Sequence, residues 1–238
     1  MFKGAIRTIV FVIGCLLAPY AAVAETLDSE TTQIVMLGTG TPNPFPDRSG
    51  PSVAIVVNDE PYLIDFGPGV VRQASAMSPE YGGSVEGLAV EKIKHAFLTH
   101  LHSDHTVGLP DLILTAWTAG RDEPLRLFGP EGSKHMADKV LEAYEEDIRY
   151  RLYSEQPANN EGWRVETHEI RETGLVFEDD NVKVEAFRVP HGSWPDAWGY
   201  RFTTPDTIIV ISGDTAPSDV VKHYSQGADV LIHEVYSE

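Results

Sequence analysis

Four side chains able to bind a metal ion fall within six consecutive positions, His100-Leu101-His102-Ser103-Asp104-His105. His100 and His102 are two residues apart, so an extended backbone would direct both imidazoles to the same side. Asp104 and His105 follow in a turn, where they can face a second ion. Imidazole nitrogen together with carboxylate oxygen suits Zn²⁺, with Mn²⁺ or Fe as alternatives. The spacing therefore predicts a dinuclear metal site, and the alternative interpretation is a polar loop rich in histidine.

The motif lies between a predicted strand and a predicted helix. Residues 94–99 form a short apolar run that is typical of a buried strand. Residues 109–119 have the apolar spacing of a helix, and Pro110 suits its first turn. Ligands at the carboxyl end of a strand and ahead of a helix occupy the place where open α/β sheets put their binding sites.

Elsewhere in the chain, strand patterns with short turns are interspersed with helical patterns. This order predicts two mixed sheets packed face to face, with the helices outside. Helices are expected at Val70–Met77, Leu109–Ala119, Ser133–Tyr150 and Ser218–Gln226. Strands are expected at Gln33–Leu37, Val53–Val57, Tyr62–Asp65, Lys94–Thr99, Leu125–Phe128, Val182–Val189, Trp198–Thr203, Thr207–Ser212 and Val230–His233.

Five segments occur in the order of a known family. Thr99–His105 resembles the signature of the metallo-β-lactamase fold superfamily, and Leu37–Pro42 resembles the glycine-rich turn after its first strand. Leu63–Gly67 resembles its Asp-x-Gly at a strand end, while Val189–Gly192 and Ile211–Thr215 supply a histidine and an aspartate. The likeness spans residues 33–234. It is strongest toward ribonuclease Z and arylsulfatase-like hydrolases, which Arg48–Ser52 and Gly199–Phe202 also resemble.

This resemblance implies a fold and a set of ligands. The implied fold is of the α+β class, an αββα sandwich of two mixed sheets with outer helices. Two Zn²⁺ ions (Mn²⁺ or Fe possible) would share a hydroxide that attacks the substrate. The implied ligands are His100, His102 and His191 for the first metal and Asp104 and His105 for the second, with Asp214 bridging both and Asp104 also accepting the proton.

Three further residues are expected to support the ligands without binding metal. Asp65 would orient a ligand imidazole, or alternatively cap the end of its strand. His233 and Glu234 resemble a His-Glu segment that lies near the site in ribonuclease Z-like proteins.

Two segments beside the expected site have two interpretations each. Trp194 and Trp198 follow His191 and could wall a substrate pocket, although packing of their loop onto the sandwich is the favoured role. The helix over Ser133–Tyr150, with the polar stretch 154–162 after it, is expected to be an ordinary surface segment rather than a lid.

The amino terminus has the pattern of a cleavable signal peptide over residues 1–24. Lys3 and Arg7 precede an apolar run, and Ala22-Val23-Ala24 forms a small-x-small cleavage site. This predicts a secreted or periplasmic domain of residues 25–238, with no stable membrane span after cleavage. An uncleaved anchor and a lipoprotein lipidated at Cys15, which is the chain's only cysteine, are the alternatives.

At the other end, the chain stops soon after the predicted strand Val230–His233. The family that it resembles continues with another helix and strand that carry a last ligand histidine. The sequence therefore predicts that the C-terminal part of the fold is missing. The alternative is a catalytically impaired, metal-binding relative with one ligand fewer.

The substrate expected from the sequence is a small ester. The formal net charge is −18, and loss of Lys3 and Arg7 would make it more negative by two. Nucleic-acid binding draws on basic residues that neutralise phosphates. Only 22 residues separate His191 from Asp214, which leaves no room for the tRNA-gripping arm of many ribonuclease Z proteins. These observations, with export, favour an exported hydrolase of an aryl sulfate, a phosphodiester, or a carboxylic ester or lactone, and make nucleic acid unlikely as a partner. A ribonuclease Z-like tRNA 3′-processing endonuclease is the alternative, and the oligomeric state is unknown.

Overall fold

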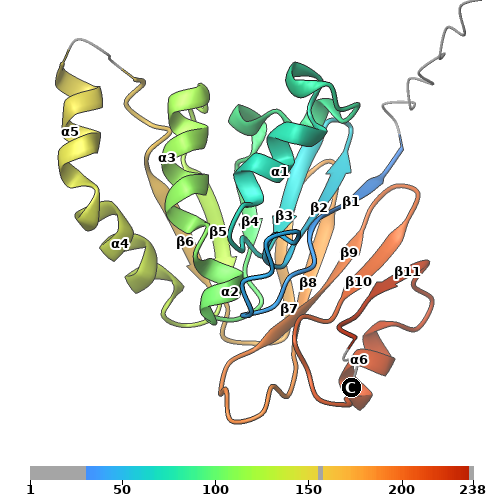
Figure 1. Cartoon of the computed structure of the whole chain (residues 1–238). Coiled ribbons are helices and arrows are strands. Elements are labelled where there is room, and N and C mark those ends of the chain that lie inside the picture. Colours follow the sequence, from blue (N-terminus) through green and yellow to red (C-terminus); the bar gives the residue numbers. More distant parts are fainter. Residues whose placement is uncertain (1–30, 155–157, 236–238) are drawn as a thin grey trace, which may run out of the picture.

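Two β-sheets lie face to face between layers of helix in the computed structural model, which describes residues 31–154 and 158–235 (Figure 1). The predicted signal peptide of residues 1–24, including Cys15, lies outside the described residues. Across the two described ranges, no helix combines the length and the apolar character that crossing a membrane requires.

The first sheet has six strands in the order β1-β2-β3-β4-β5-β6. Pairing is antiparallel from β1 to β3 and parallel from β3 to β6. Asn58 and Asp59 join β2 to β3, and their φ angles of 52° and 60° are typical of a type I′ hairpin turn. The strands are β1 (Gln33–Gly38), β2 (Ser52–Val57), β3 (Glu60–Ile64), β4 (His95–Phe97), β5 (Leu125–Gly129) and β6 (Val165–Glu169).

The second sheet has five strands in the order β11-β10-β9-β8-β7. Only the pair β10 and β11 is parallel, so this sheet is mixed, like the first. The strands are β7 (Gly174–Glu178), β8 (Lys183–Arg188), β9 (Trp198–Thr203), β10 (Ile208–Ile211) and β11 (Val230–Ile232).

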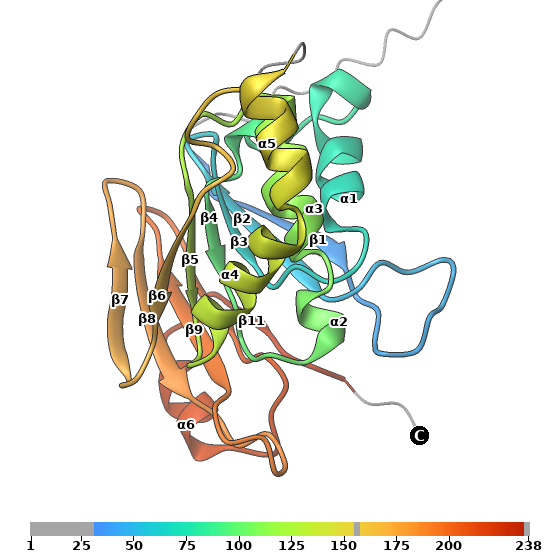
Figure 2. The ribbon, with the colours of Figure 1, turned by 90° about the vertical axis from the view of Figure 1, so that its left-hand side faces the viewer.

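Helices cover the outer face of each sheet, which confirms the expected αββα sandwich. Figure 2 shows the first sheet between the second sheet and the helices α1, α3, α4 and α5, with α6 on the far side of the second sheet. The short helix α2 (Ser103–Thr106) carries part of the metal-binding motif. The others are α1 (Val70–Met77), α3 (Leu109–Ala119), α4 (Ser133–Ala143), α5 (Glu145–Tyr153) and α6 (Asp219–Tyr224), with 3₁₀ turns at Pro79–Tyr81, Glu86–Leu88 and Val90–Lys92.

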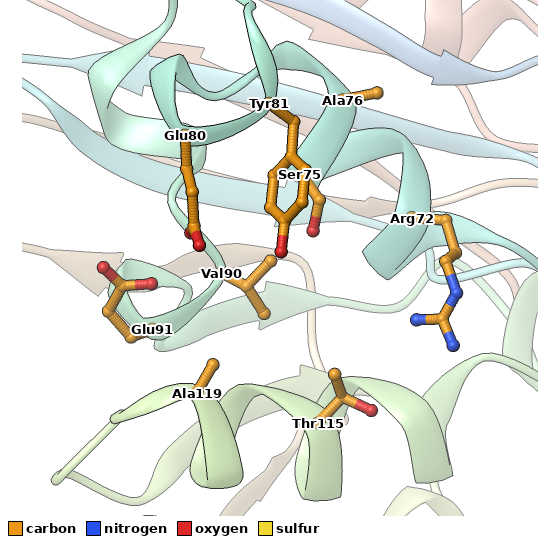
Figure 3. Close-up of a pocket in the computed structure, with 9 residues that line it drawn as sticks. All are labelled: Arg72, Ser75, Ala76, Glu80, Tyr81, Val90, Glu91, Thr115 and Ala119. Carbon is orange, nitrogen blue, oxygen red and sulfur yellow. The ribbon is translucent and has the colours of Figure 1, made fainter.

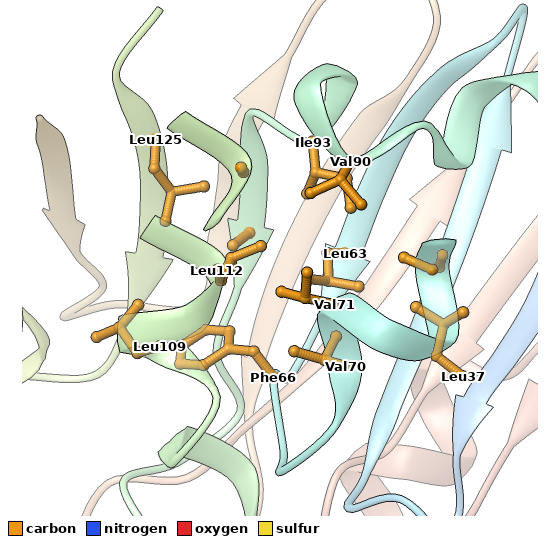
Figure 4. Packing of buried hydrophobic residues seen from close by; sticks show 14 of the residues in the cluster. Leu37, Leu63, Phe66, Val70, Val71, Val90, Ile93, Leu109, Leu112 and Leu125 are labelled. Carbon is orange, nitrogen blue, oxygen red and sulfur yellow. The ribbon is translucent and has the colours of Figure 1, made fainter. Parts of the chain in front are cut away.

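Side chains of the first sheet alternate between two apolar cores. In β2, Ile55 packs toward the second sheet, whereas Ala54 and Val56 face the helices. Because both faces are covered, this strand is a continuous apolar run and not an alternation of polar and apolar residues. Figure 4 shows the helix-side core, in which Leu112 of α3 and Val71 of α1 lie over Leu63 of β3; all three are buried.

The core between the sheets fixes the end of β4, from which the metal-binding motif emerges. Phe97 is fully buried, with its ring stacked 5.0 Å from Phe128 and edge-on to Tyr200 and Phe202 at 5.7 and 5.3 Å. Aromatic rings that pack at these distances add stability beyond the area they bury. This packing fixes the end of β4, which His100 follows closely in the chain.

Two expectations about the elements are wrong. Strands were not expected at β6 and β7, which lie at the edges of their sheets. β6 is mostly polar, and the apolar run of β7 spans only three residues, Leu175 to Phe177. The segment Ser133–Tyr150 is two helices, interrupted at Tyr144, whose φ is −105° and ψ is 15°. Residues 145–147 are all acidic, and carboxylates favour the start of a new helix.

Candidate metal centre

The expected metal ligands lie where three strand ends of the two sheets meet. His100 follows β4, His191 follows β8 and Asp214 follows β10. The backbone amide of Trp198 donates to the carbonyl of Thr99 at 2.9 Å, which ties the second sheet to the motif. The candidate centre therefore depends on the packing of the two sheets.

Three imidazoles converge at one point. The Nδ1 atom of His102 lies 2.9 Å from Nε2 of His100 and 3.2 Å from Nε2 of His191. One nitrogen from each ring lies within 4.8 Å of the other two. Three imidazole nitrogens in this arrangement suit Zn²⁺. The structure thus brings together the three residues expected to bind the first metal.

A second group consists of His100, His105 and Asp214, whose donor atoms also lie within 4.8 Å of one another. His105 Nε2 is 3.6 Å from an oxygen of Asp214 and 3.6 Å from one of Asp104. This nitrogen is buried and has no hydrogen-bond partner. A buried polar atom without a partner is costly, and a cation held between it and the carboxylates would remove that cost. The residues present therefore fit a second metal ion.

Asp104 lies beside this second group and not within it. Its carboxylate is buried and reaches His105, but its oxygens belong to neither three-donor group. The structure places the other five expected ligands in those groups, and Asp104 at the edge of the second.

The carboxylate of Asp65 orients the imidazoles of His100 and His105 from the side opposite the candidate metal centre. It accepts hydrogen bonds from Thr99 N at 2.8 Å, from Thr99 Oγ1 at 2.9 Å and from His105 Nδ1 at 2.8 Å. Thr99 Oγ1 also lies 3.0 Å from His100 Nδ1 and accepts its proton, because its own proton goes to Asp65. Both histidines therefore hold a proton on Nδ1 and direct Nε2 toward the centre.

The position of Asp65 is itself strained. Its φ of +57° lies in the left-handed region that few residues other than glycine, asparagine and aspartate adopt. The backbone is held there by its N–H, which donates to Phe97 O at 2.8 Å, and by its carbonyl, which accepts from Ser52 Oγ at 2.9 Å. Asp65 acts both in orienting an imidazole and in ending its strand, so the two expected roles are not exclusive.

Burial and charge separate the two histidines of the second group. Burial, reinforced by the charge of His105, lowers the pKa of His100 to about 3. Burial would also lower the pKa of His105, but Asp65 and Asp214 outweigh it and raise that pKa to about 10. Burial would raise the pKa of Asp214, yet His105 outweighs it and lowers that pKa. At neutral pH His100 is thus ready to bind a metal, whereas His105 must first lose a proton.

The loop that carries Asp214 is fastened by the two residues expected to support the site. His233 Nδ1 lies 2.7 Å from Ser212 Oγ, and Glu234 accepts a hydrogen bond from Thr215 N at 2.6 Å. Both side chains thus hold the loop on either side of Asp214. The roles of Ser212 and Thr215 were not expected, because the sequence does not show which distant residues they contact.

The two tryptophans after His191 have different roles. Trp198 is fully buried between the sheets, as the packing interpretation expected. Trp194 is half-buried, and its ring centroid lies 4.3 Å from that of His102. One of the two rings therefore does border the candidate metal centre.

A hollow of about 640 Å³ lies elsewhere, on the helical face between α1 and α3 (Figure 3). Its lining includes Arg72, Glu80 and Glu91, and Arg72 lies 3.9 Å from Asp111. None of the candidate ligands lines it. The hollow is therefore separate from the metal centre.

Comparison with known proteins agrees with this geometry. Residues 61–237 match the model of the beta-lactamase superfamily domain. Ribonuclease Z of Mycobacterium bovis (strain BCG / Pasteur 1173P2) is 32% identical over 206 residues, which are 85% of this chain and 70% of the relative. Ribonuclease Z of Mycobacterium sp. (strain KMS) is 34% identical over 204 residues, which are 84% and 67% of the two chains. The crystal structure of human tRNase Z, short form, superposes with a TM-score of 0.67 at 25% identity, covering 87% of this chain and 79% of that one.

The chain therefore belongs to the beta-lactamase superfamily of metal-dependent hydrolases with the metallo-β-lactamase fold, whose members bind divalent metal ions, typically zinc. Within that superfamily it is related to the ribonuclease Z proteins.

The expectation that the substrate is a small ester is wrong, because the curated relatives are named ribonuclease Z. The expectation that nucleic acid is unlikely as a partner is wrong for the same reason, and the alternative of a ribonuclease Z-like enzyme fits better. Net charge sums the whole surface, whereas binding at one centre depends on the local field, which here comes from clustered imidazoles and any cations they hold. The short stretch between His191 and Asp214 leaves no room for a tRNA-gripping arm, but it does not exclude RNA binding by other parts of the chain.

Proposed function

We propose that this chain is a metal-dependent phosphodiesterase that acts on RNA in the manner of ribonuclease Z. The observation that carries the proposal is the pair of donor groups that share His100, one with three imidazoles and one with the unpartnered Nε2 of His105. The names of the curated relatives support RNA as the substrate class, with the 3′ end of tRNA precursors as the first candidate.

In this proposal the two groups hold two metal ions. His100, His102 and His191 would hold the first, and His105 and Asp214 would hold the second, with Asp104 at its edge. Bound divalent ions supply Lewis-acid polarisation of a phosphoryl oxygen and lower the pKa of water. Zn²⁺ suits the nitrogen-rich donor set.

The protein's own groups would position the reaction and move its proton. Asp104 is buried beside the second group, so its carboxylate is placed to orient the attacking water and accept its proton at an Oδ atom. Asp65 and Thr99 keep the proton of His105 and of His100 on Nδ1, away from the centre. The Nε2 atoms of both rings are thereby fixed in direction, toward the centre, before substrate arrives.

The proposal is tested with a precursor tRNA that carries a 3′ extension, incubated with the zinc-loaded chain. Cleavage should stop on chelation, return with zinc and be lost in His191→Ala. His223→Ala is the matched control, because His223 is exposed on α6, outside both donor groups. Failure of the zinc-loaded chain to cleave the precursor, or full activity of His191→Ala, would overturn the proposal.

A further inference from the structure

Trp194 places its indole at the edge of the three-histidine group. Its ring centroid lies 4.3 Å from that of His102 at an interplanar angle of 61°, and 6.1 Å from that of His100 at 75°. One side of the candidate metal centre is therefore walled by an aromatic ring. The proposed mechanism assigns this ring no role.

The indole is held by the backbone and by apolar packing. The backbone N–H of Trp194 donates to the carbonyl of His191 at 2.9 Å, in a tight turn in which Gly192 has a φ of +53°. The ring also packs against the apolar cluster on the outer face of the second sheet, which includes Phe187 and Val221. A side chain fixed in this way loses little conformational entropy when a ligand binds to it.

The exposure of Trp194 differs from that of the core tryptophans. Trp117 and Trp198 are at most 1% exposed, whereas Trp194 is half-buried. A partly exposed indole offers an apolar surface beside the centre at which a phosphate group would bind. Nucleobases stack on such surfaces with little dependence on which base is present, because every base has a π-face.

We infer that Trp194 is a specificity-determining residue that stacks against the nucleobase next to the scissile phosphate. The inference rests on the proposed function, since it places an RNA phosphate at the metal centre. Such a contact would make the chain prefer nucleotides to sugar phosphates that lack a base. Loss of one stacked base corresponds to about a five- to 150-fold weaker interaction.

The test compares two ligands that share a ribose 5-phosphate group and differ in the base. Binding of adenosine 5′-monophosphate and of ribose 5-phosphate to the zinc-loaded chain is measured by calorimetry. The wild type should bind the nucleotide more tightly. Trp194→Ala and Trp194→Leu should reduce that preference by about five- to 150-fold, whereas Trp194→Phe should keep most of it.

Trp163→Ala is the matched control. Trp163 is also half-buried, with the guanidinium of Arg164 5.0 Å from its ring, but it precedes β6 and lies outside both donor groups. Its removal should leave the preference for the nucleotide unchanged.

Two results would overturn the inference. The first is a wild type that binds both ligands equally well. The second is a Trp194 variant that loses zinc or weakens both ligands to the same extent, because the indole would then serve only to hold His102. None of these measurements needs turnover. A base preference that depends on Trp194 in a chain that cleaves no RNA would therefore count against the proposed function alone.

Discussion

Replacement of Asp65 by asparagine should weaken zinc binding without disturbing the fold around it. Asparagine has the same shape and tolerates the positive φ of this position. One carboxylate oxygen accepts from Thr99 Oγ1 and His105 Nδ1, and the other accepts from Thr99 N. An amide has only one acceptor oxygen. In either orientation its NH₂ group therefore faces a donor.

The magnitude follows from what the amide does to the imidazoles. If the amide oxygen of the asparagine still accepts the hydrogen bond from Thr99 N, its NH₂ group faces His105 Nδ1 and Thr99 Oγ1. It would favour the tautomers of His105 and His100 that carry the proton on Nε2, where the metal must bind. Loss of such a supporting hydrogen bond typically costs 10- to 100-fold in metal affinity, or about 1.4 to 2.7 kcal/mol.

The assay is competition for zinc against a chromophoric chelator at fixed pH. Asp59→Asn is the matched control, because Asp59 also has a positive φ but lies at the other end of β3, in the turn from β2. An affinity of Asp65→Asn within twofold of wild type would refute the reasoning. An equal loss in Asp59→Asn would refute it as well.

Three other perturbations have defined outcomes. Zinc affinity should rise with pH, by up to about tenfold per unit between pH 7 and 8.5. The reason is that the pKa of His105 is about 10 without metal, so fewer protons compete with zinc as the pH approaches that value. Chelator competition at several pH values checks this, and an affinity that does not change with pH contradicts it. Gly213→Ala should reduce zinc content and RNA cleavage together, since the φ of Gly213 is +61° and an added Cβ would lie 3.0 Å from Thr99 Cβ. Mass spectrometry measures the zinc content and a cleavage assay the activity. Wild-type values of both would contradict the strain argument. Phe97→Ala should lower the free energy of unfolding by about 3–5 kcal/mol; urea denaturation measures this, and a loss under about 1 kcal/mol would mean that the inter-sheet packing is misassigned.

The elements that the sequence predicted well are those whose burial leaves a pattern. α1 and α3 were predicted with their observed bounds, and β2 stands out as an apolar run because both its faces are covered. β6 could not be found in this way, because this edge strand has mostly polar residues, and β7 could not because its apolar run spans only three residues. The break at Tyr144 had a signal in the acidic residues after it, which the long helical pattern concealed.

For the candidate site, the sequence predicted the ligands that lie together in one segment, but not the contacts between distant segments. His100, His102 and His105 follow from the motif itself, and the structure places them together. The hydrogen bonds of Ser212 and Thr215 to His233 and Glu234 join residues about 20 positions apart, and only the fold reveals them. The substrate class was misjudged because charge and composition describe the whole chain, whereas binding at the centre depends on a few residues.

The central claim is that the two donor groups hold two metal ions that support RNA cleavage. It is tested most directly by adding zinc in steps to the metal-free chain while the rate of cleavage of a 3′-extended precursor tRNA is recorded. We expect a rate that rises and levels off at about two zinc ions per chain, with the second equivalent ineffective in His105→Ala. A chain that cleaves nothing at any zinc level, or a rate that is independent of zinc, would contradict it.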